Sequence, residues 1–93
     1  MKKKQDFEQI SESLKVISHP IRLQIISALL KDECNVSKIQ EKLGLPQATV
    51  SQHLALLRRS GVVQARREGA RVCYHIVDPR VRKIIEVISQ ETE

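Results

Sequence analysis

The stretch SKIQEKLGLPQATVSQHLALLRR, residues 37–59, predicts two helices joined by a tight turn, and it decides the fold. Gly44 follows the first helix at the position where a left-handed residue costs least. The second helix is expected over residues 46–60, with Pro46 at its start. Directly after it, VVQARREGARVCYHI at residues 62–76 has the alternation of two strands around a turn. A helix-turn-helix followed by such a hairpin, or wing, is typical of domains that place one helix in the DNA major groove.

Apolar residues at helical spacing predict three more helices around this centre. One is expected over residues 6–17, one from the His19-Pro20 pair onward, and one over residues 79–90. Ser37 and Gln40 fit a capping box at the start of the third helix. The predicted fold is mainly α with a small β hairpin, a winged helix-turn-helix of order α-α-(β)-α-α-β-β-α. It is expected to occupy the 93 residues as one domain, with residues 1–5 as a flexible basic arm.

Charge is concentrated in the part of the chain that would meet DNA. The net charge is +5, and residues 47–75 contain five arginines against a single acidic residue, Glu68. A solvated basic surface would have the same composition, but so local an excess favours contact with phosphates. The wing arginines Arg66, Arg67 and Arg71 flank the expected turn, from which they could clamp phosphates or enter the minor groove.

The first turns of the 46–60 helix are rich in amide and hydroxyl side chains, which suit base edges and phosphate oxygens. His53 lies beside the apolar stripe of this helix, where a structural imidazole is commoner than a base reader. The predicted DNA-contacting residues are Gln47, Thr49, Ser51, Gln52, His53, Arg58, Arg66, Arg67 and Arg71. In the second wing strand, Val72, Tyr74 and Ile76 are expected to form the buried face.

Other classes of function have little support in the sequence. The histidines and glycines form no catalytic constellation or phosphate loop, so neither an enzyme nor a cofactor is expected. The absence of a long apolar run and of a signal peptide pattern predicts a cytoplasmic protein. Two widely spaced cysteines fit a reducing compartment. A protein-interaction module that keeps the winged helix but binds DNA weakly is the alternative from another class.

Three segments together resemble the winged-helix repressors of the ArsR/SmtB type: HPIRLQIISALL, LGLPQATVSQHLALLRRSGVV and REGARVCYHI. The resemblance implies a homodimer joined by its first and last helices, which represses transcription by binding double-stranded DNA at an inverted-repeat operator. Gln47, Ser51 and Gln52 match DNA-contacting positions of the family, while Ala48 replaces a common serine. The dimer interface would use the apolar stripes of the two terminal helices, namely Phe7, Ile10, Leu14, Val81, Ile84, Ile85 and Ile88.

The metal sites of the family are missing from this sequence. Asn35 and Ser37 stand where metal-sensing members have a Cys-x-Cys pair, and the last helix has no histidine. No metal site is therefore carried over, and the sequence identifies no small-molecule or metal inducer.

Cys34 and Cys73 remain, and three interpretations of them are open. In the family the extended piece before the third helix commonly pairs with the second wing strand, which would allow a redox-switched Cys34–Cys73 disulfide. Both could instead be ordinary reduced residues. They could also form a zinc site with His75, in a metal-responsive repressor.

Overall fold

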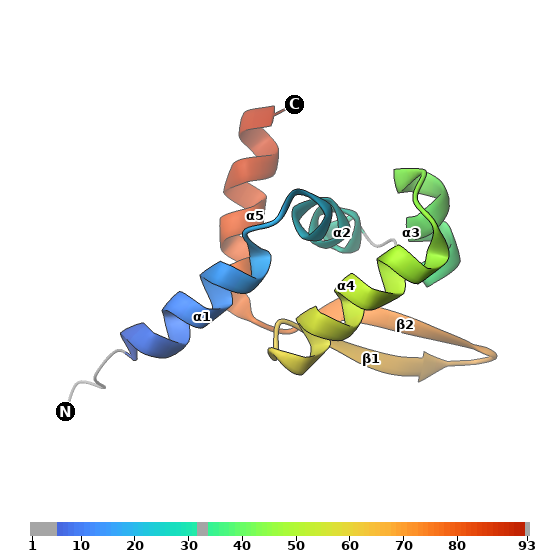
Figure 1. The fold of residues 1–93 in the computed structure, drawn as a ribbon, viewed down its shortest axis with the longest axis horizontal. Coiled ribbons are helices and arrows are strands. Elements are labelled where there is room, and N and C mark those ends of the chain that lie inside the picture. The colour runs from blue at the N-terminus through green and yellow to red at the C-terminus, as the bar shows by residue number, and fades with distance from the viewer. Residues whose placement is uncertain (1–5, 32–33, 93) are drawn as a thin grey trace.

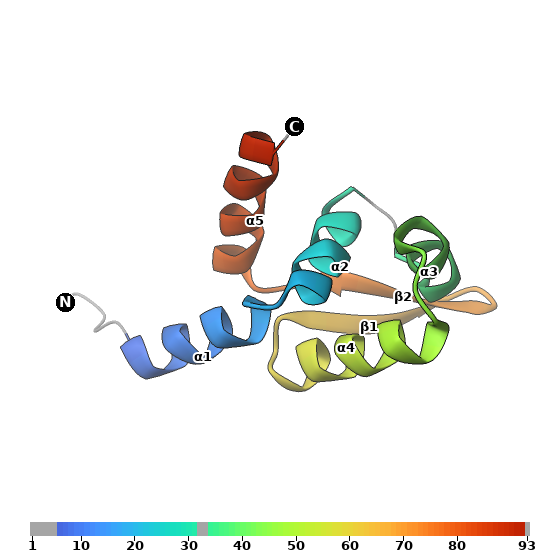
Figure 2. The same cartoon turned by 45° about the horizontal axis from the view of Figure 1, so that its top comes forward.

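The computed structural model describes residues 6–31 and 34–92, and these contain five helices and a two-stranded antiparallel sheet. The elements are α1 (Phe7–Ile17), α2 (Pro20–Leu30), α3 (Val36–Leu43), α4 (Gln47–Arg59), β1 (Val63–Glu68), β2 (Arg71–Ile76) and α5 (Pro79–Thr92). This order confirms the predicted winged helix-turn-helix. α1 and α5 lie toward one end of the molecule, and α3 and the hairpin tip lie at the other (Figures 1 and 2). The arm predicted at residues 1–5 is outside the described residues.

The first two helices begin with side-chain caps. Asp6 caps α1, where its carboxylate accepts from the backbone N–H of Gln9 at 3.1 Å. His19 caps α2 by accepting from the N–H of Ile21 at 3.1 Å, and Pro20 follows as the first helical residue. The His-Pro start predicted for the second helix is therefore confirmed.

The start of α3 differs from the prediction. Asn35, and not Ser37, is the N-cap, because its side-chain oxygen accepts from the N–H of Ser37 at 2.8 Å. The predicted capping box was wrong, since both residue types can cap and the helix begins two residues earlier than expected. Its end is as predicted: Gly44 has φ 67°, and its N–H donates to the carbonyl of Gln40 at 2.9 Å.

The wing is a tight hairpin with a third, short partner. β1 and β2 pair from Val63 opposite Ile76 to Glu68 opposite Arg71, so the turn contains only two residues. A single antiparallel bridge joins Asn35 to Cys73, and the N–H of Tyr74 donates to the carbonyl of Cys34 at 3.0 Å. The extended piece before the third helix therefore pairs with the second wing strand.

Burial along β2 departs from the predicted alternation of buried and exposed residues. Ile76 is buried and Tyr74 half-buried, as predicted, but Val72 is 39% exposed. Cys73, on the opposite face, is fully buried. The prediction of a buried Val72-Tyr74-Ile76 face was wrong at Val72, because that residue lies near the hairpin tip. On the other face, the buried side chain of Cys73 is bonded to Cys34.

The core lies between α2, α3, the inner face of α4, the base of the hairpin and α5. It includes Ile25, Ile26, Ile39, Val50, Leu54, Leu57, Val62, Val63, Val81 and Ile85. The apolar side of α4 is thus buried as expected, which leaves its opposite side to solvent. Within the described ranges no helix combines the length and the apolarity needed to cross a membrane.

The two terminal helices keep some apolar side chains outside this core. Phe7 is 73% exposed on α1, and Val87 is 60% exposed on α5. Leu14 and Ile88 are also more than two-fifths exposed. Of the residues predicted for a dimer interface, Val81 and Ile85 are buried inside the chain. The apolar stripe of α5 is wide, and one side of it packs into the core of the same chain.

Candidate nucleic-acid interface and thiol pair

The N-terminal half of α4 presents the predicted polar side chains. Gln47, Ser51 and Gln52 are exposed, and Thr49 is half-buried. Pro46, the N-cap, makes no side-chain hydrogen bond to the helix, so the backbone N–H groups of the first turn have no capping acceptor. Exposed amides and hydroxyls beside a helix N-terminus form a surface suited to an anionic polymer.

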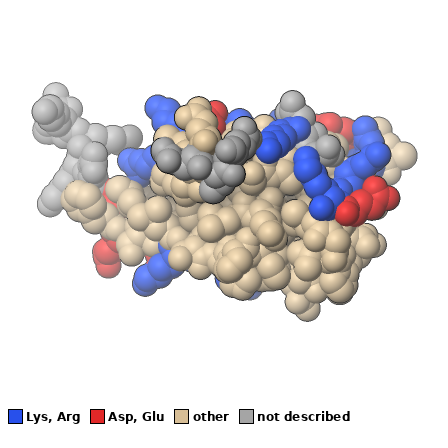
Figure 3. Space-filling view, turned by 90° about the horizontal axis from the view of Figure 1, so that it is seen from above, with Lys and Arg blue, Asp and Glu red and all other residues tan. Residues whose placement is uncertain are grey.

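The wing places arginines on both faces of the hairpin. Arg66 is opposite Cys73 and Arg67 is opposite Val72, so the two side chains leave the sheet in opposite directions. Arg71 lies on the same face as Arg66, and all three are exposed. On the face seen in Figure 3, basic and acidic side chains lie close together at the end that carries α3 and the hairpin. Positive charge is therefore exposed on both faces of the hairpin.

The polar end of α4 and the hairpin tip lie at the same end of the molecule (Figures 1 and 2). Arg58 does not join them, since it is in the last turn of α4. It lies eleven positions after Gln47 along the helix, a rise of roughly 16 Å. Of the predicted DNA-contacting set, the structure thus brings together the α4 start and the wing, and it places Arg58 apart.

His53 lies against a second histidine. Its ring centroid is 4.8 Å from that of His19, the N-cap of α2, and its side chain is half-buried. Burial lowers the pKa of His53, and the nearby His19 and Arg22 lower it further. The Arg22 guanidinium is itself held by the carbonyl of Val16 at 2.7 Å, at the end of α1. His53 therefore sits at the junction of α1, α2 and α4.

The lowered pKa of His53 predicts a loss of stability in mild acid. The unfolded chain takes up a proton near the ordinary histidine pKa of about 6.5, whereas the folded chain does so only at lower pH. Protonation of His53 therefore does not favour the unfolded state above about pH 7. Below the pKa of the unfolded chain, it lowers the free energy of unfolding increasingly as the pH falls. Urea denaturation at about pH 7.5 and about pH 5.5 should show a smaller acid loss in His53→Gln than in the wild type. An equal loss in both proteins would contradict this assignment.

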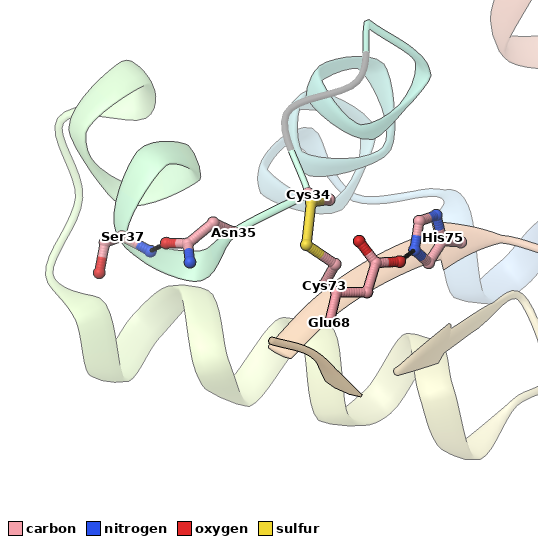
Figure 4. The surroundings of a disulfide bond; sticks show 6 residues. All are labelled: Cys34, Asn35, Ser37, Glu68, Cys73 and His75. Atoms are coloured by element: carbon pink, nitrogen blue, oxygen red, sulfur yellow. Dashed lines mark hydrogen bonds and ion pairs between the residues drawn. A yellow bond between two sulfur atoms is a disulfide. The ribbon is translucent and has the colours of Figure 1, made fainter. Parts of the chain in front are cut away.

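Cys34 and Cys73 form a disulfide bond between the α2–α3 link and β2 (Figure 4). Their Cα atoms are 4.6 Å apart, within the range that a disulfide requires. The pairing of the extended piece with β2 produces this proximity. Of the three interpretations of the cysteines, the structure thus contains the bonded pair.

Glu68 is a residue of this site that was not predicted from the sequence. Its carboxylate oxygen and the two sulfur atoms lie within 4.8 Å of one another. Nε2 of His75 is hydrogen-bonded to the same carboxylate at 2.9 Å, so His75 reaches the cysteines through Glu68 (Figure 4). The hairpin register was the available signal: with a two-residue turn, Glu68 and Cys73 become diagonal neighbours on one face.

Comparison with known proteins agrees with this architecture. Residues 19–65 match the sequence pattern of the family described as "Bacterial regulatory protein, arsR family". The chain is 41% identical over 83 residues to the transcriptional repressor PagR of Bacillus anthracis, which covers 88% of this chain and 83% of PagR. The crystal structure of PagR superposes with a TM-score of 0.82, over 88% of this chain and 94% of that one.

Two further relatives have the same fold. The chain is 40% identical over 75 residues to the transcriptional activator HlyU of Vibrio cholerae, covering 81% of this chain and 69% of HlyU. A structure of reduced HlyU superposes with a TM-score of 0.83, over 89% of this chain and 87% of that one. The homodimeric winged helix-turn-helix DNA-binding domain Mb0332 of Mycobacterium bovis is 29% identical, with a TM-score of 0.79 over 99% of this chain and 90% of that one. The chain therefore belongs to the arsR family of bacterial regulatory proteins.

Proposed function

We propose that this regulator is a homodimeric transcriptional repressor that binds an inverted-repeat operator in double-stranded DNA. In this proposal α4 enters the major groove with Gln47, Ser51 and Gln52 toward the bases. The wing arginines and Arg58 contact phosphates along the groove edges. The protein acts in the cytoplasm, where its DNA is found, and needs neither a cofactor nor a catalytic activity.

The observation that carries the proposal is the position of two exposed elements at the same end of the molecule. The exposed polar start of α4 and the exposed arginines of the wing lie at one end of the molecule, clear of the core. An ordinary solvent-exposed surface does not require this arrangement, because polar residues can face water anywhere on the molecule. The family membership adds support, since PagR is named as a repressor and Mb0332 as a DNA-binding domain. HlyU is named as an activator, so the experiment must also distinguish repression from activation.

The proposed dimer uses the apolar side chains that the chain leaves exposed. Phe7 and Leu14 on α1 and Val87 and Ile88 on α5 belong to the two terminal helices. A second copy would remove these side chains from water, at a gain of about 25 cal/mol per Å². Mb0332, which shares the fold, is homodimeric. A two-fold dimer would place its two α4 helices in successive major grooves, about 34 Å apart.

The thiol pair is proposed to regulate this binding. In the oxidised chain the Cys34–Cys73 bond fixes the wing to the start of α3, the first helix of the helix-turn-helix. Reduction of the bond frees the wing from this link, so the two forms hold the wing arginines differently. We expect the oxidised form to bind the operator more weakly.

Fluorescence anisotropy with a labelled duplex from upstream of the regulator's own gene tests the proposal. The reduced protein should bind it more tightly than a scrambled duplex of the same length, and its affinity should fall steeply with salt. Oxidation should weaken binding in the wild type and have no effect in Cys34→Ser, which serves as the matched control. A promoter-reporter assay then separates repression from activation.

Each alternative result has a distinct meaning. Equal affinity of the reduced and oxidised wild type would leave a repressor without a thiol switch. Weak binding with little salt dependence in both forms would instead favour a winged-helix protein-interaction module.

A further inference from the structure

The thiol pair is part of a larger set of metal-ligating atoms. Sγ of Cys34, Sγ of Cys73 and a carboxylate oxygen of Glu68 lie within 4.8 Å of one another. They come from the α2–α3 link, from β2 and from the end of β1, so three separate segments converge on one point (Figure 4). We propose that the reduced protein binds a zinc ion through these three groups, at a site distinct from the positions at Asn35 and Ser37.

The dimensions of the cluster suit such an ion. Zinc bonds to thiolate sulfur at about 2.3 Å and to carboxylate oxygen at about 2.0–2.2 Å, so the ligands of a tetrahedral ion lie roughly 3.5 Å apart. The Cα atoms of Cys34 and Cys73, 4.6 Å apart, hold both sulfurs at one place. Small side-chain rotations would bring the three donor atoms to one ion. No change in the pairing of β1, β2 and the Asn35 bridge is needed.

The type of donor selects the metal. Two thiolates with a carboxylate favour a borderline-soft ion such as Zn²⁺ over Mg²⁺ or Ca²⁺, which prefer oxygen ligands alone. The side chain of Glu68 is 47% exposed, so an ion can reach the site from solvent. The fourth position of the tetrahedron is left to water.

His75 has a supporting role in this site. Its Nε2 atom lies 2.9 Å from Glu68 Oε2, and its side chain is 32% exposed. A hydrogen bond of this kind orients a ligating carboxylate, and its loss typically weakens metal binding 10- to 100-fold. His75 is therefore a positioning residue for Glu68. The zinc site considered from sequence, with His75 as the third ligand, is replaced here by one with Glu68.

The disulfide and the ion exclude each other, because both use the same two sulfurs. Hydrogen peroxide would convert one state to the other: two thiolates lose two electrons and form the S–S bond, while the O–O bond breaks. The two oxygens take up two protons to complete two water molecules, and Zn²⁺ leaves. The site is thus available only in the reduced protein, and it shares with the proposed function only the reducible thiol pair.

Zinc titration of the full-length protein tests the inference without DNA. Protein reduced with a phosphine and freed of metal is titrated with ZnCl₂ against a chromophoric chelator, and separately with CoCl₂. We expect one zinc per chain, and a thiolate-to-cobalt charge-transfer band in the near ultraviolet. Peroxide treatment should abolish both.

Variants locate the site on the proposed residues. Glu68→Gln should lower the zinc affinity at least tenfold and His75→Gln should lower it by a similar factor. Cys34→Ser should lose the charge-transfer band, and the far-ultraviolet circular dichroism of each variant checks that it is folded. Glu41→Gln, which removes an exposed carboxylate from α3, is the matched control and should bind like the wild type.

Failure of this inference is distinguishable from failure of the proposed function. Reduced wild type that holds no zinc against the chelator, or Glu68→Gln that binds as tightly as wild type, would overturn the site. Either result would leave the DNA-binding measurements unaffected.

Discussion

Reduction of the Cys34–Cys73 disulfide is expected to lower the free energy of unfolding by about 4 kcal/mol. The two cysteines are separated by 39 positions in the sequence, so the bond closes a long loop. In the unfolded chain such a cross-link removes conformational freedom, and the folded state gains stability by comparison. For a chain of 93 residues this is a large share of the 5–15 kcal/mol that typical domains have.

Urea denaturation of oxidised and reduced protein measures this difference. A chelator must be present throughout, because a bound zinc ion would cross-link the same segments and mask the effect. Cys34→Ser should have the stability of the reduced wild type, with or without reductant. Coincident unfolding curves for oxidised and reduced wild type would contradict the prediction.

Replacement of the three wing arginines by glutamine is expected to abolish most of the salt-dependent affinity for DNA. Each phosphate contact contributes about 0.9 to the slope of log K against log salt, so loss of three contacts should lower the slope by nearly three per chain. Arg66, Arg67 and Arg71 are exposed and lie on two faces of the hairpin, so the substitutions should leave the core intact. Anisotropy titrations at several salt concentrations give the slope directly.

A control variant that loses the same number of positive charges separates the effect of phosphate contacts from the effect of net charge. Arg80, Arg82 and Lys83 are exposed on α5, outside the wing and α4. Their triple replacement by glutamine removes three positive charges as well, and it should change the slope far less. Equal effects of the two triple variants would show that the wing makes no specific phosphate contacts.

The helices and the hairpin could be predicted from sequence because local signals specify them. The stripe of Val50, Leu54 and Leu57 buries one face of α4, and Gly44 ends α3 in the left-handed conformation that its position indicated. The polar start of α4 was also predictable, since a helix with one buried face must expose the other.

Other features depend on contacts between segments that are distant in the sequence, and these could not be predicted from local patterns. Cys73 is buried, and its sulfur is bonded to Cys34 from a distant segment, and no alternation within β2 contains that information. Glu68 joins the sulfurs through the hairpin register, which depends on the turn length. On α5 a single apolar stripe serves both the core, at Val81 and Ile85, and the exposed surface, and periodicity alone does not divide the two.

The cross-link also changes the topology of the chain. Residues 34–73 contain all of α3, α4 and β1, so oxidation turns this part of the polypeptide into a covalent ring with two arms, one carrying α1 and α2 and the other α5. A single proteolytic cut within the ring would leave one molecule on a non-reducing gel, whereas a cut in either arm would release a fragment. The helices proposed to hold two copies together would thus stay joined to each other even after the segment proposed to contact DNA had been severed.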